Sequence, residues 1–394
     1  MRDMGTRRDI GRVGSEEELT QLGAILGWAF GSPEPKATQW LRRGGVDNVK
    51  VARESGRVIG GLLEIPMGQW FSGRSVPMLG IAGVAVALDA RGRGVALALM
   101  QASLRAARER GFALSVLYPA THTLYRALGY ELAGGYYSYS MAAKDCPREK
   151  SGLRAMLSSA DDAPALTALY DEIARERSGY LDRNAYIWAR VREPHEERAL
   201  GIVARGEHGI DGYAYMNQGP SKSGDYDLIL SDLVARNPRA LQQLLGFFAN
   251  QRSTLGNIVW RASVADAALL AFNEQVFTPT IDRYWMLRLL DVGRALELRG
   301  YPELDAEITL EVEDELFPEN AGAYQLTVER GRPSVSRGGN AGVRLDVRSL
   351  AALYSGFLSA EELRRAGALS ADGATLRTLS SVFSGTPPAM ADYF

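Results

Sequence analysis

A glycine-rich bend between two apolar segments carries the residue types that could do chemistry in this chain. Residues 84–88 form an apolar run, residues 91–94 (Arg-Gly-Arg-Gly) form the bend, and apolar residues then recur at helical spacing through Leu104. Gly92 and Gly94 lack a Cβ, so an anionic group can approach the backbone N–H donors of the bend closely. The following helix start adds unsatisfied N–H groups and a partial positive charge. The pattern predicts a cradle for a pyrophosphate.

Three nucleotide-binding patterns compete for this segment, and their spacing separates them. A P-loop requires a Gly-Lys-Ser/Thr ending, which is absent, and a dinucleotide fingerprint requires glycine or alanine where Leu97 stands. The spacing that fits, Arg91-x-x-Gly94-x-Ala96, resembles the acetyl-CoA signature of the GCN5-related N-acetyltransferases. Because Arg-Gly-x-Gly turns also join ordinary strands to helices, a purely structural turn is the alternative at this point.

A second signature follows at the separation that this superfamily shows. Residues 112–118 predict a buried strand that ends before Pro119, and an aromatic-x-x-x-Gly-Tyr pattern runs from Tyr125 to Tyr130. A last strand is predicted over residues 136–141. Two linked signatures favour an acetyl-CoA-dependent acetyltransferase domain. In that superfamily the two central strands splay apart, and the free backbone binds the pantetheine arm as a pseudo-strand.

The length, charge and cysteine content of the chain limit the kinds of protein that it can be. The chain has 394 residues, of which 46% are apolar, enough for two or three domains with their own cores. The net charge is −2 without a long basic run, which argues against nucleic acid or an anionic membrane as the main partner. Cys146 is the single cysteine and there are three histidines, so neither a disulfide nor a metal site is expected. Residues 1–14 are polar, so we expect a cytoplasmic protein, with export by an unconventional route left open.

A helix and a hairpin are predicted ahead of the bend. Apolar spacing predicts a helix over residues 16–30 with Ser15 as its N-cap, and residues 49–53 and 58–64 predict two strands joined by a turn. Five aromatic residues could line an acceptor pocket or simply fill the core: Trp28, Phe30, Trp40, Trp70 and Phe71. Glu64 lies in the superfamily's usual neighbourhood for a general base, although a carboxylate at a strand end is more often solvated.

The middle of the chain repeats the same order of elements after a polar linker near residues 146–152. Its helices are predicted over 160–177, 185–192 and 238–251, and its strands over 199–204, 212–216, 225–233 and 257–261. The bend at 234–238 contains no glycine, and Asp225, Asp227 and Asp232 lie nearby, so this block should not hold coenzyme A. We interpret it as a degenerate second copy, with an unrelated α/β domain as the alternative.

The last part of the chain predicts an α+β domain. Residues 285–301 open it; strands follow at 306–312, 322–330, 334–336 and 343–347, and helices at 349–357, 360–366 and 374–383. This order resembles the sterol-carrier-protein fold. Taken alone, that fold favours a lipid-binding module, which keeps a non-enzymatic hypothesis open.

The whole chain is similar to the enhanced intracellular survival (Eis) family of acetyltransferases. The resemblance rests on the bend, on residues 124–130, on the segment Arg288-Leu289-Leu290-Asp291-Val292 and on the terminal Tyr393-Phe394. It implies an α/β (α+β) chain with two tandem acetyltransferase-like domains, the second degenerate, and a sterol-carrier-like domain. The implied boundaries are 1–145, 146–287 and 288–394.

The resemblance also assigns roles to residues. It implies Tyr125 as the general acid and the free carboxylate of Phe394 as the general base. The implied acetyl-CoA contacts are Val84, Ala85, Val86, Arg91, Gly92, Arg93, Gly94, Val95, Ala96, Leu97, Ala120 and Thr121. The chain departs from the family pattern at residues 120–122, where relatives often carry a small polar residue and an acid. His122 is expected to be a local hydrogen-bonding partner rather than the base.

Solution chemistry favours the same roles. An amine attacks a thioester only when neutral, so a base must take a proton from the substrate ammonium. An α-carboxylate has a pKa of about 3.3–3.7 in water, which burial raises, so the pocket should be partly dry. A thiol has a pKa of about 8.5 and tyrosine about 10, so full proton transfer from Tyr125 would be uphill by about 2 kcal/mol. Tyr125 should therefore donate as the bond breaks or have a locally lowered pKa.

We predict an N-acetyltransferase that moves acetyl from acetyl-CoA to primary amines without a metal. The family likeness implies broad acceptors, including aminoglycosides and protein lysine side chains, and a homo-hexamer built as a trimer of dimers. Trp28, Trp40, Glu64 and Asp392 are the predicted acceptor-binding residues, and the carboxylates would supply the negative field that polycations need. Two alternatives stay open: a scaffold that binds coenzyme A or lipid without turnover, and an acetyltransferase specific for one metabolite or protein lysine.

Overall fold

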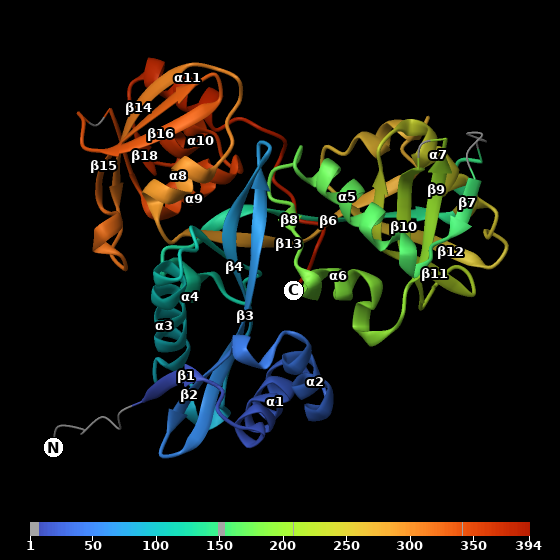
Figure 1. The fold of residues 1–394 in the computed structure, drawn as a ribbon, viewed down its shortest axis with the longest axis horizontal. Coiled ribbons are helices and arrows are strands. Elements are labelled where there is room, and N and C mark those ends of the chain that lie inside the picture. The colour runs from blue at the N-terminus through green and yellow to red at the C-terminus, as the bar shows by residue number, and fades with distance from the viewer. Residues whose placement is uncertain (1–7, 149–153, 208, 341) are drawn as a thin grey trace.

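Three lobes make up the protein in the computed structural model (Figure 1). The structure describes residues 8–148, 154–207, 209–340 and 342–394, so most of the predicted linker lies outside the described residues. The first lobe ends with β6 (Glu131–Ala142), the second runs from β7 (Arg154–Leu157) to β12 (Leu255–Ala262), and the third begins at α8 (Val292–Leu298). In Figure 1 the C-terminus lies at the centre of the molecule, near α6 (Ala185–Arg192) of the second lobe. The predicted α/β fold class is confirmed.

One thirteen-stranded sheet joins the first two lobes. Its order is β1-β2-β3-β4-β5-β13-β6-β12-β11-β10-β9-β7, with β8 paired to β3. The first-lobe strands before β6 are β1 (Asp9–Arg12), β2 (Val49–Glu54), β3 (Arg57–Phe71), β4 (Arg74–Val86) and β5 (Leu114–Leu117). The helices of this lobe are α1 (Glu16–Phe30), α2 (Glu34–Arg43), α3 (Val95–Glu109) and α4 (His122–Arg126).

The predicted helix over residues 16–30 is confirmed, and its ends have clear causes. The Ser15 hydroxyl accepts a hydrogen bond from the Glu18 N–H at 3.2 Å, which caps the start of α1. Gly31 adopts a left-handed conformation with φ of 66° and ends it. The hairpin is also confirmed, but β3 extends to Phe71 through Pro66. The Pro66 carbonyl faces away from β4 and accepts a hydrogen bond from Asn184, so the missing N–H breaks no pairing with β4.

The first two lobes exchange their last strands. β13 (Phe277–Leu289) follows the second lobe in sequence, yet it pairs with β5 and β6 of the first lobe. β6 in turn pairs with β12 of the second lobe, from Asn257 with Ala142 to Ala262 with Tyr137. Each lobe therefore completes the sheet of the other, and the two halves fold as one hydrogen-bonded unit.

The second lobe repeats the order of the first. Its elements are β7, η4 (Ala160–Asp162), α5 (Ala163–Ala174), β8 (Leu181–Asp182), α6, β9 (Leu200–Gly206), β10 (Gly209–Gly219), β11 (Tyr226–Ala235), α7 (Pro238–Ala249), β12 and η6 (Ala267–Ala271). β11 and β12 are parallel, as β4 and β5 are in the first lobe. The repeat predicted from the order of elements is therefore present.

The third lobe has a separate five-stranded sheet in the order β16-β15-β14-β17-β18. Its strands are β14 (Ala306–Glu313), β15 (Gly322–Glu329), β16 (Arg332–Arg337), β17 (Val343–Asp346) and β18 (Leu369–Ser370), and its later helices are α9 (Val347–Ser355), α10 (Ala360–Arg365) and α11 (Gly373–Val382). α9 is buried along almost its whole length. Among the described residues, no helix is long and apolar enough to cross a bilayer.

After α11 the chain returns from the third lobe to the first two. Ala389 donates its N–H to Ser178 O at 3.0 Å and forms an isolated bridge with Gly135 of β6. We call residues 388–394 the C-terminal tail. The tail ends in the region where the first and second lobes meet.

Candidate active site

The glycine-rich bend leads directly into α3, and the start of that helix is open. Gly92 and Gly94 have φ values of 73° and 74°, a region that favours glycine. Gly94 is the N-cap and offers no side-chain hydrogen bond, so the first N–H groups of α3 remain for a ligand. A Cβ built at Gly92 would meet no described atom within 4 Å. An exposed bend and an uncapped helix start fit a pyrophosphate.

The two arginines of the bend are placed differently. Arg93 donates to Glu54 Oε1 at 2.5 Å, and its carbonyl oxygen accepts a hydrogen bond from Arg8 at 2.6 Å. Arg91 lies beside it and is exposed. Arg93 therefore fixes the bend against β2, while Arg91 adds positive charge at its surface. Val95, Ala96 and Leu97, also predicted to contact the cofactor, form the first turn of the helix.

An open strand edge lies next to the bend. Pairing between β4 and β5 ends at Ile81 and Leu117, whereas β4 continues to Val86 paired with β3 alone. The open stretch contains Val84, Ala85 and Val86, and it is the splay expected for a pantetheine-binding edge. Ala120 and Thr121 are exposed in the loop after β5. Their contacts with a cofactor stay a prediction.

Tyr125 lies in the short helix α4, which follows this loop. Its side chain is 5% exposed, and its ring packs edge-on against Tyr130 with centroids 6.0 Å apart. Among the residues that the structure describes, no hydrogen bond to its hydroxyl is formed. Tyr130 differs, because its hydroxyl lies 2.6 Å from Ser115 Oγ, which donates to Leu79 O. Tyr125 is thus a buried phenol with a donor that is free for a ligand.

Burial raises the pKa of Tyr125 to about 12. Two alternatives were expected for Tyr125: donation as the bond breaks, or a locally lowered pKa. In the protein without its cofactor the pKa is raised, so the second alternative does not apply to that state. Against a thiol pKa of about 8.5, complete transfer from Tyr125 would be uphill by about 5 kcal/mol. For Tyr125 as the predicted general acid, this leaves donation during bond breaking, in which the thiolate never has to form free in solution.

Two side chains from outside the C-terminal tail donate hydrogen bonds to its backbone. Tyr118 donates to the Asp392 carbonyl at 2.6 Å, and Arg190 of α6 donates to the Tyr393 carbonyl at 2.9 Å. Phe394 is 6% exposed and packs against Tyr118, with ring centroids 5.8 Å apart. The terminal residue is therefore docked and not a frayed end.

A pocket of about 680 Å³ lies beside the tail. Its lining comes from α1, α2, the open end of β4, α6 with the turn after it, and the tail: Leu26, Phe30, Ser32, Lys36, Ala37, Trp40, Arg43, Ala82, Gly83, Tyr186, Ala189, Arg190, Glu193, His195, Glu196, Tyr393 and Phe394. Gly83 has φ of 59°, and a Cβ there would lie 2.7 Å from the Trp40 ring, so glycine lets this ring pack on the strand. The pocket thus joins the expected cofactor edge to the C-terminal residue.

The predicted acceptor-binding residues are not all brought together. Trp40 lines the pocket, as does Phe30, while Trp28 is 72% exposed on α1 and is not part of the lining. Glu64 is buried in ion pairs with Lys50 at 2.9 Å and Arg110 at 2.8 Å.

Asp392 also forms a buried ion pair, in which its oxygens lie 2.9 and 3.0 Å from Arg183 nitrogens. Glu64 and Asp392 are therefore both buried in ion pairs and not presented to the acceptor pocket, although Arg183 is shared between Asp392 and Asp232. In the lining itself, Arg43 pairs with Glu193 at 2.6 Å.

Sequence reasoning missed two residues that hold the tail. Tyr118 sits in the predicted strand next to Pro119, and Arg190 sits in the predicted helix 185–192, but neither carries a motif. Their role depends on contacts with a segment more than 200 residues away in sequence, which no local pattern encodes.

Comparisons with known proteins match this architecture. Families described as acetyltransferase (GNAT) domains match residues 12–133 and 179–289, and the sterol carrier protein domain matches residues 292–391. A crystal structure of a GCN5-related N-acetyltransferase from Anabaena variabilis is 35% identical, with a TM-score of 0.94 over 98% of this chain and 100% of that chain. The chain belongs to the GCN5-related N-acetyltransferases.

Other relatives of this GCN5-related N-acetyltransferase share its full length or most of it. A GCN5-related N-acetyltransferase from Kribbella flavida is 28% identical with a TM-score of 0.86 over 98% of each chain. An uncharacterized N-acetyltransferase from Streptomyces avermitilis is 27% identical over 78% of this chain and 80% of its own length. Eis1 from Mycobacterium abscessus has a TM-score of 0.81 at 22% identity over 98% of this chain, which shows a shared fold.

The protein is thus an acetyltransferase, and enzymes of this family use acetyl-CoA. The bend and the open edge of β4 fit that donor. Within the described part of the chain, no group of three or more His, Cys, Asp or Glu side chains could hold a metal ion.

Proposed function

We propose that the enzyme acetylates primary amines in the pocket that the tail helps to line. One observation carries the proposal: Ala82 and Gly83, on the open edge of β4, and Phe394, the terminal residue, line the same pocket. An amine in this pocket would be close to both the acetyl donor and a carboxylate.

The reaction follows from these groups. The carboxylate of Phe394 accepts a proton from the substrate ammonium, directly or through water, and the neutral amine then attacks the thioester carbonyl. As the carbon–sulfur bond breaks, the Tyr125 hydroxyl donates its proton to the sulfur. As the intermediate collapses, the attacking nitrogen loses its second proton, which restores Tyr125 through solvent, and the carboxylate returns its proton to bulk water. The products are the N-acetyl amine, coenzyme A thiol and one proton.

The acceptor class follows from the size and charge of the pocket together with the family likeness. A volume of about 680 Å³ is large for a single amine group and suits several acceptors, including aminoglycosides and lysine side chains. Lys36, Arg43 and Arg190 in the lining offset Glu193, Glu196 and the terminal carboxylate. Shape therefore contributes more to acceptor choice than net charge does.

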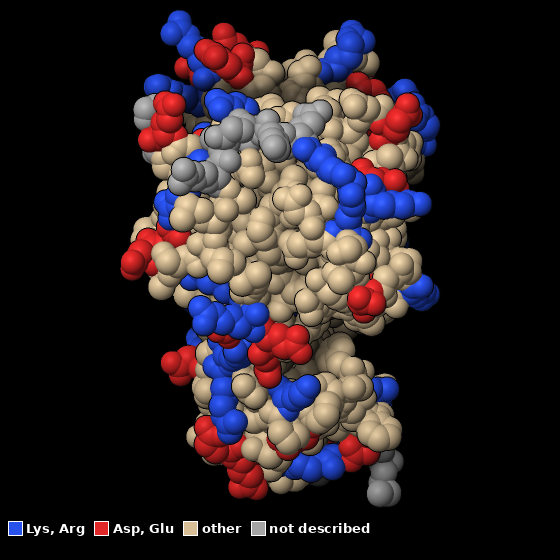
Figure 2. Space-filling view, turned by 90° about the vertical axis from the view of Figure 1, so that its right-hand side faces the viewer, with Lys and Arg blue, Asp and Glu red and all other residues tan. Residues whose placement is uncertain are grey.

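Assembly into a homo-hexamer, as a trimer of dimers, also belongs to this proposal, as does a cytoplasmic location. Figure 2 shows the side of the molecule formed by the second lobe, where uncharged side chains cover the centre. Met156, Leu157 and Leu200 are exposed on β7, the last strand of the sheet, and on its neighbour β9. Exposed apolar residues at a sheet edge favour contact with another copy.

The test changes only the chain end. Wild type is compared with a variant extended by two residues after Phe394 and with a semisynthetic enzyme whose terminal carboxylate is an amide. We expect both changes to abolish thiol release from acetyl-CoA with polyamine and aminoglycoside acceptors, while acetyl-CoA still binds. The same two residues added before Met1 serve as the control. Full turnover by the amidated enzyme would show that the base lies elsewhere.

A further inference from the structure

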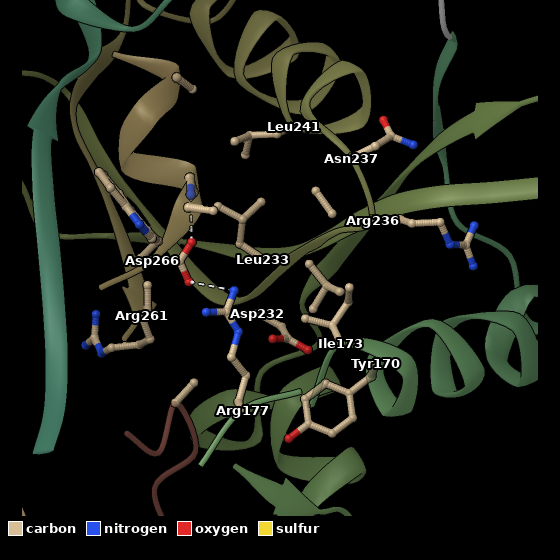
Figure 3. A pocket seen from close by; sticks show the side chains of 18 of the residues that line it. Tyr170, Ile173, Arg177, Asp232, Leu233, Arg236, Asn237, Leu241, Arg261 and Asp266 are labelled. Atoms are coloured by element: carbon tan, nitrogen blue, oxygen red, sulfur yellow. Dashed lines mark hydrogen bonds and ion pairs between the residues drawn. The ribbon is translucent and has the colours of Figure 1, made fainter. Parts of the chain in front are cut away.

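A second pocket, of about 340 Å³, lies in the second lobe (Figure 3). It is formed by the end of β11, the start of α7, the end of β12 and η6, with α5 on the other side. Pairing of β11 with β12 ends at Ile229 and Val259, so this pocket occupies the same place between parallel strands as the cofactor edge of the first lobe. It shares no lining residue with the pocket beside Phe394.

In this second cleft, the groups that correspond to the predicted phosphate-binding groups of the first lobe are already bonded to other parts of the protein. The Asn237 side chain accepts from the Ala240 N–H at 2.9 Å and caps α7, and Pro238 has no N–H to offer. Arg236 is held by Glu172 at 2.8 Å and by Asp211 at 2.9 Å. In Figure 3 its side chain points away from the pocket. The start of α7 and Arg236 therefore offer a pyrophosphate fewer donors than the open start of α3 does, in line with the predicted degeneracy.

The pocket nevertheless keeps donors without partners. Arg177 extends into it from below in Figure 3, and its single ion pair among the described residues is with Asp266 at 3.9 Å. A guanidinium has five N–H donors, so the edge of Arg177 that does not face Asp266 can still donate hydrogen bonds. Trp260 lines the pocket, is 3% exposed, and its buried indole N–H has no hydrogen-bond partner in the described residues.

The acids in the lining already have hydrogen-bonding partners. Asp232 lies 2.6 Å from Arg183 and accepts a hydrogen bond from Tyr213 at 2.7 Å. Asp266 accepts from the Ala268 N–H at 2.8 Å in addition to facing Arg177. The donors that remain are thus cationic or neutral, and a ligand that accepts hydrogen bonds satisfies them.

Several of the other lining residues are apolar. Ile173, Leu233 and Leu241 surround the pocket in Figure 3. The Trp260 ring is held by stacking on Tyr139 and Phe272, at centroid distances of 5.3 and 6.1 Å. A volume of about 340 Å³ is at the lower end for small-molecule sites.

We propose that this pocket is a binding site for a small organic carboxylate with an aromatic or short aliphatic body. The carboxylate receives hydrogen bonds from Arg177 and the Trp260 indole, and the body lies among the apolar walls. Ala391 of the C-terminal tail also lines the pocket, so a bound ligand contacts the tail. The site is separate from the proposed amine site, and its test does not depend on turnover.

The test is titration calorimetry of the full-length enzyme with three probes that share one body. These are 4-phenylbutyrate and the neutral 4-phenylbutanol and 4-phenylbutyramide, none of which is an amine that the acceptor pocket would take. We expect saturable one-to-one binding of the carboxylate with a Kd of about 1 mM or tighter, and about tenfold weaker binding of the other two. Equal binding of all three, or no saturable binding of the carboxylate, would overturn the proposal.

Two arginine variants locate the site. Arg177→Gln should weaken 4-phenylbutyrate binding about tenfold. Arg236→Gln is the matched control, because Arg236 lines the same pocket but is committed to Glu172 and Asp211. Arg236→Gln should change the Kd of 4-phenylbutyrate by less than about twofold, since the Arg236 donors are already bonded to carboxylates of the protein. Equal Kd values for the two variants would overturn the proposal, and retained acetyl-CoA binding shows that both are folded.

Discussion

The Tyr118 hydroxyl donates a hydrogen bond to the backbone carbonyl of Asp392 at 2.6 Å. Tyr118 directly follows β5, whose edge separates from β4 where the cofactor is expected, and Asp392 lies two residues before the chain end. Burial raises the pKa of Tyr118 well above its usual value, so it stays a donor at every working pH. One hydrogen bond thus connects the residue after β5 to the last residues of the C-terminal tail.

Tyr118→Phe should lower kcat about tenfold and leave acetyl-CoA affinity within about twofold, because one lost hydrogen bond of about 1 kcal/mol loosens the tail. Tyr139→Phe is the control, since Tyr139 is also buried and donates to a carbonyl, that of Ser263, at 2.9 Å. Thiol-release kinetics and thermal unfolding of both variants measure the effects. Similar losses of kcat in both would mean that Tyr118 contributes only to stability.

Local capping explains why much of the secondary structure could be predicted. Ser15, Asn184 and Asn237 each cap a helix through a side-chain oxygen, and each stands directly before an apolar periodic run. The predicted helices over residues 16–30 and 185–192 agree with α1 and α6 residue for residue. α2 was missed because it buries only Ala37, Thr38 and Leu41, and its start has no side-chain cap.

Contacts between distant segments could not be predicted in the same way. The exchange of β6 and β13 depends on strand pairing across two lobes. The ion pairs of Glu64 likewise come from Lys50 and Arg110, which belong to two other segments of the chain. Two of the motifs noted in the sequence do meet in space, because a Cβ at Gly129 would lie 2.6 Å from Arg288 Nη1. The motif residues were visible in the sequence, but their contact was not.

Gly94→Ala should weaken acetyl-CoA binding about tenfold, because the bend needs φ of 74° and its N–H groups must stay accessible. Gly56→Ala is the matched control in the turn between β2 and β3, where φ is 78° and a Cβ meets no described atom within 4 Å. Both variants should lose about 1 kcal/mol of stability from the same left-handed strain. Calorimetric titration with acetyl-CoA separates them, and equal affinities would place the pyrophosphate away from the bend.

Tyr125→Phe should lower kcat about 100-fold with little change in acetyl-CoA affinity, since it removes the donor to the leaving sulfur and keeps the ring packing. Because burial raises the pKa of Tyr125 to about 12, the wild-type phenol stays protonated through neutral and mildly alkaline pH. The rate should therefore rise with pH as the amine loses its proton, without a fall below about pH 10 from this group. A descending limb near pH 8 that disappears in Tyr125→Phe would contradict this assignment.

Glu64→Gln should destabilise the protein at pH 7 by about 3 kcal/mol, because it leaves Lys50 and Arg110 without their buried partner. Burial alone would raise the pKa of Glu64, but the Ser103 hydrogen bond and the charge of Lys50 outweigh it, so the pKa is lowered. A carboxyl with a lowered folded pKa stabilises the protein above its unfolded pKa of about 4.3, and this contribution is lost as pH falls through the folded pKa. The difference between variant and wild type should therefore shrink in acid.

Denaturant unfolding at pH 7 and at lower pH measures this effect, with Glu16→Gln as the control. Glu16 pairs with Arg42 at 2.7 Å on the surface, where an ion pair contributes about 0–1 kcal/mol, so this variant should be nearly neutral. Below its unfolding temperature, Glu64→Gln should keep kcat within about twofold, since the carboxylate is enclosed by its partners and lies outside the lining of the acceptor pocket. A folded Glu64→Gln enzyme that has lost turnover would instead assign Glu64 to the chemistry.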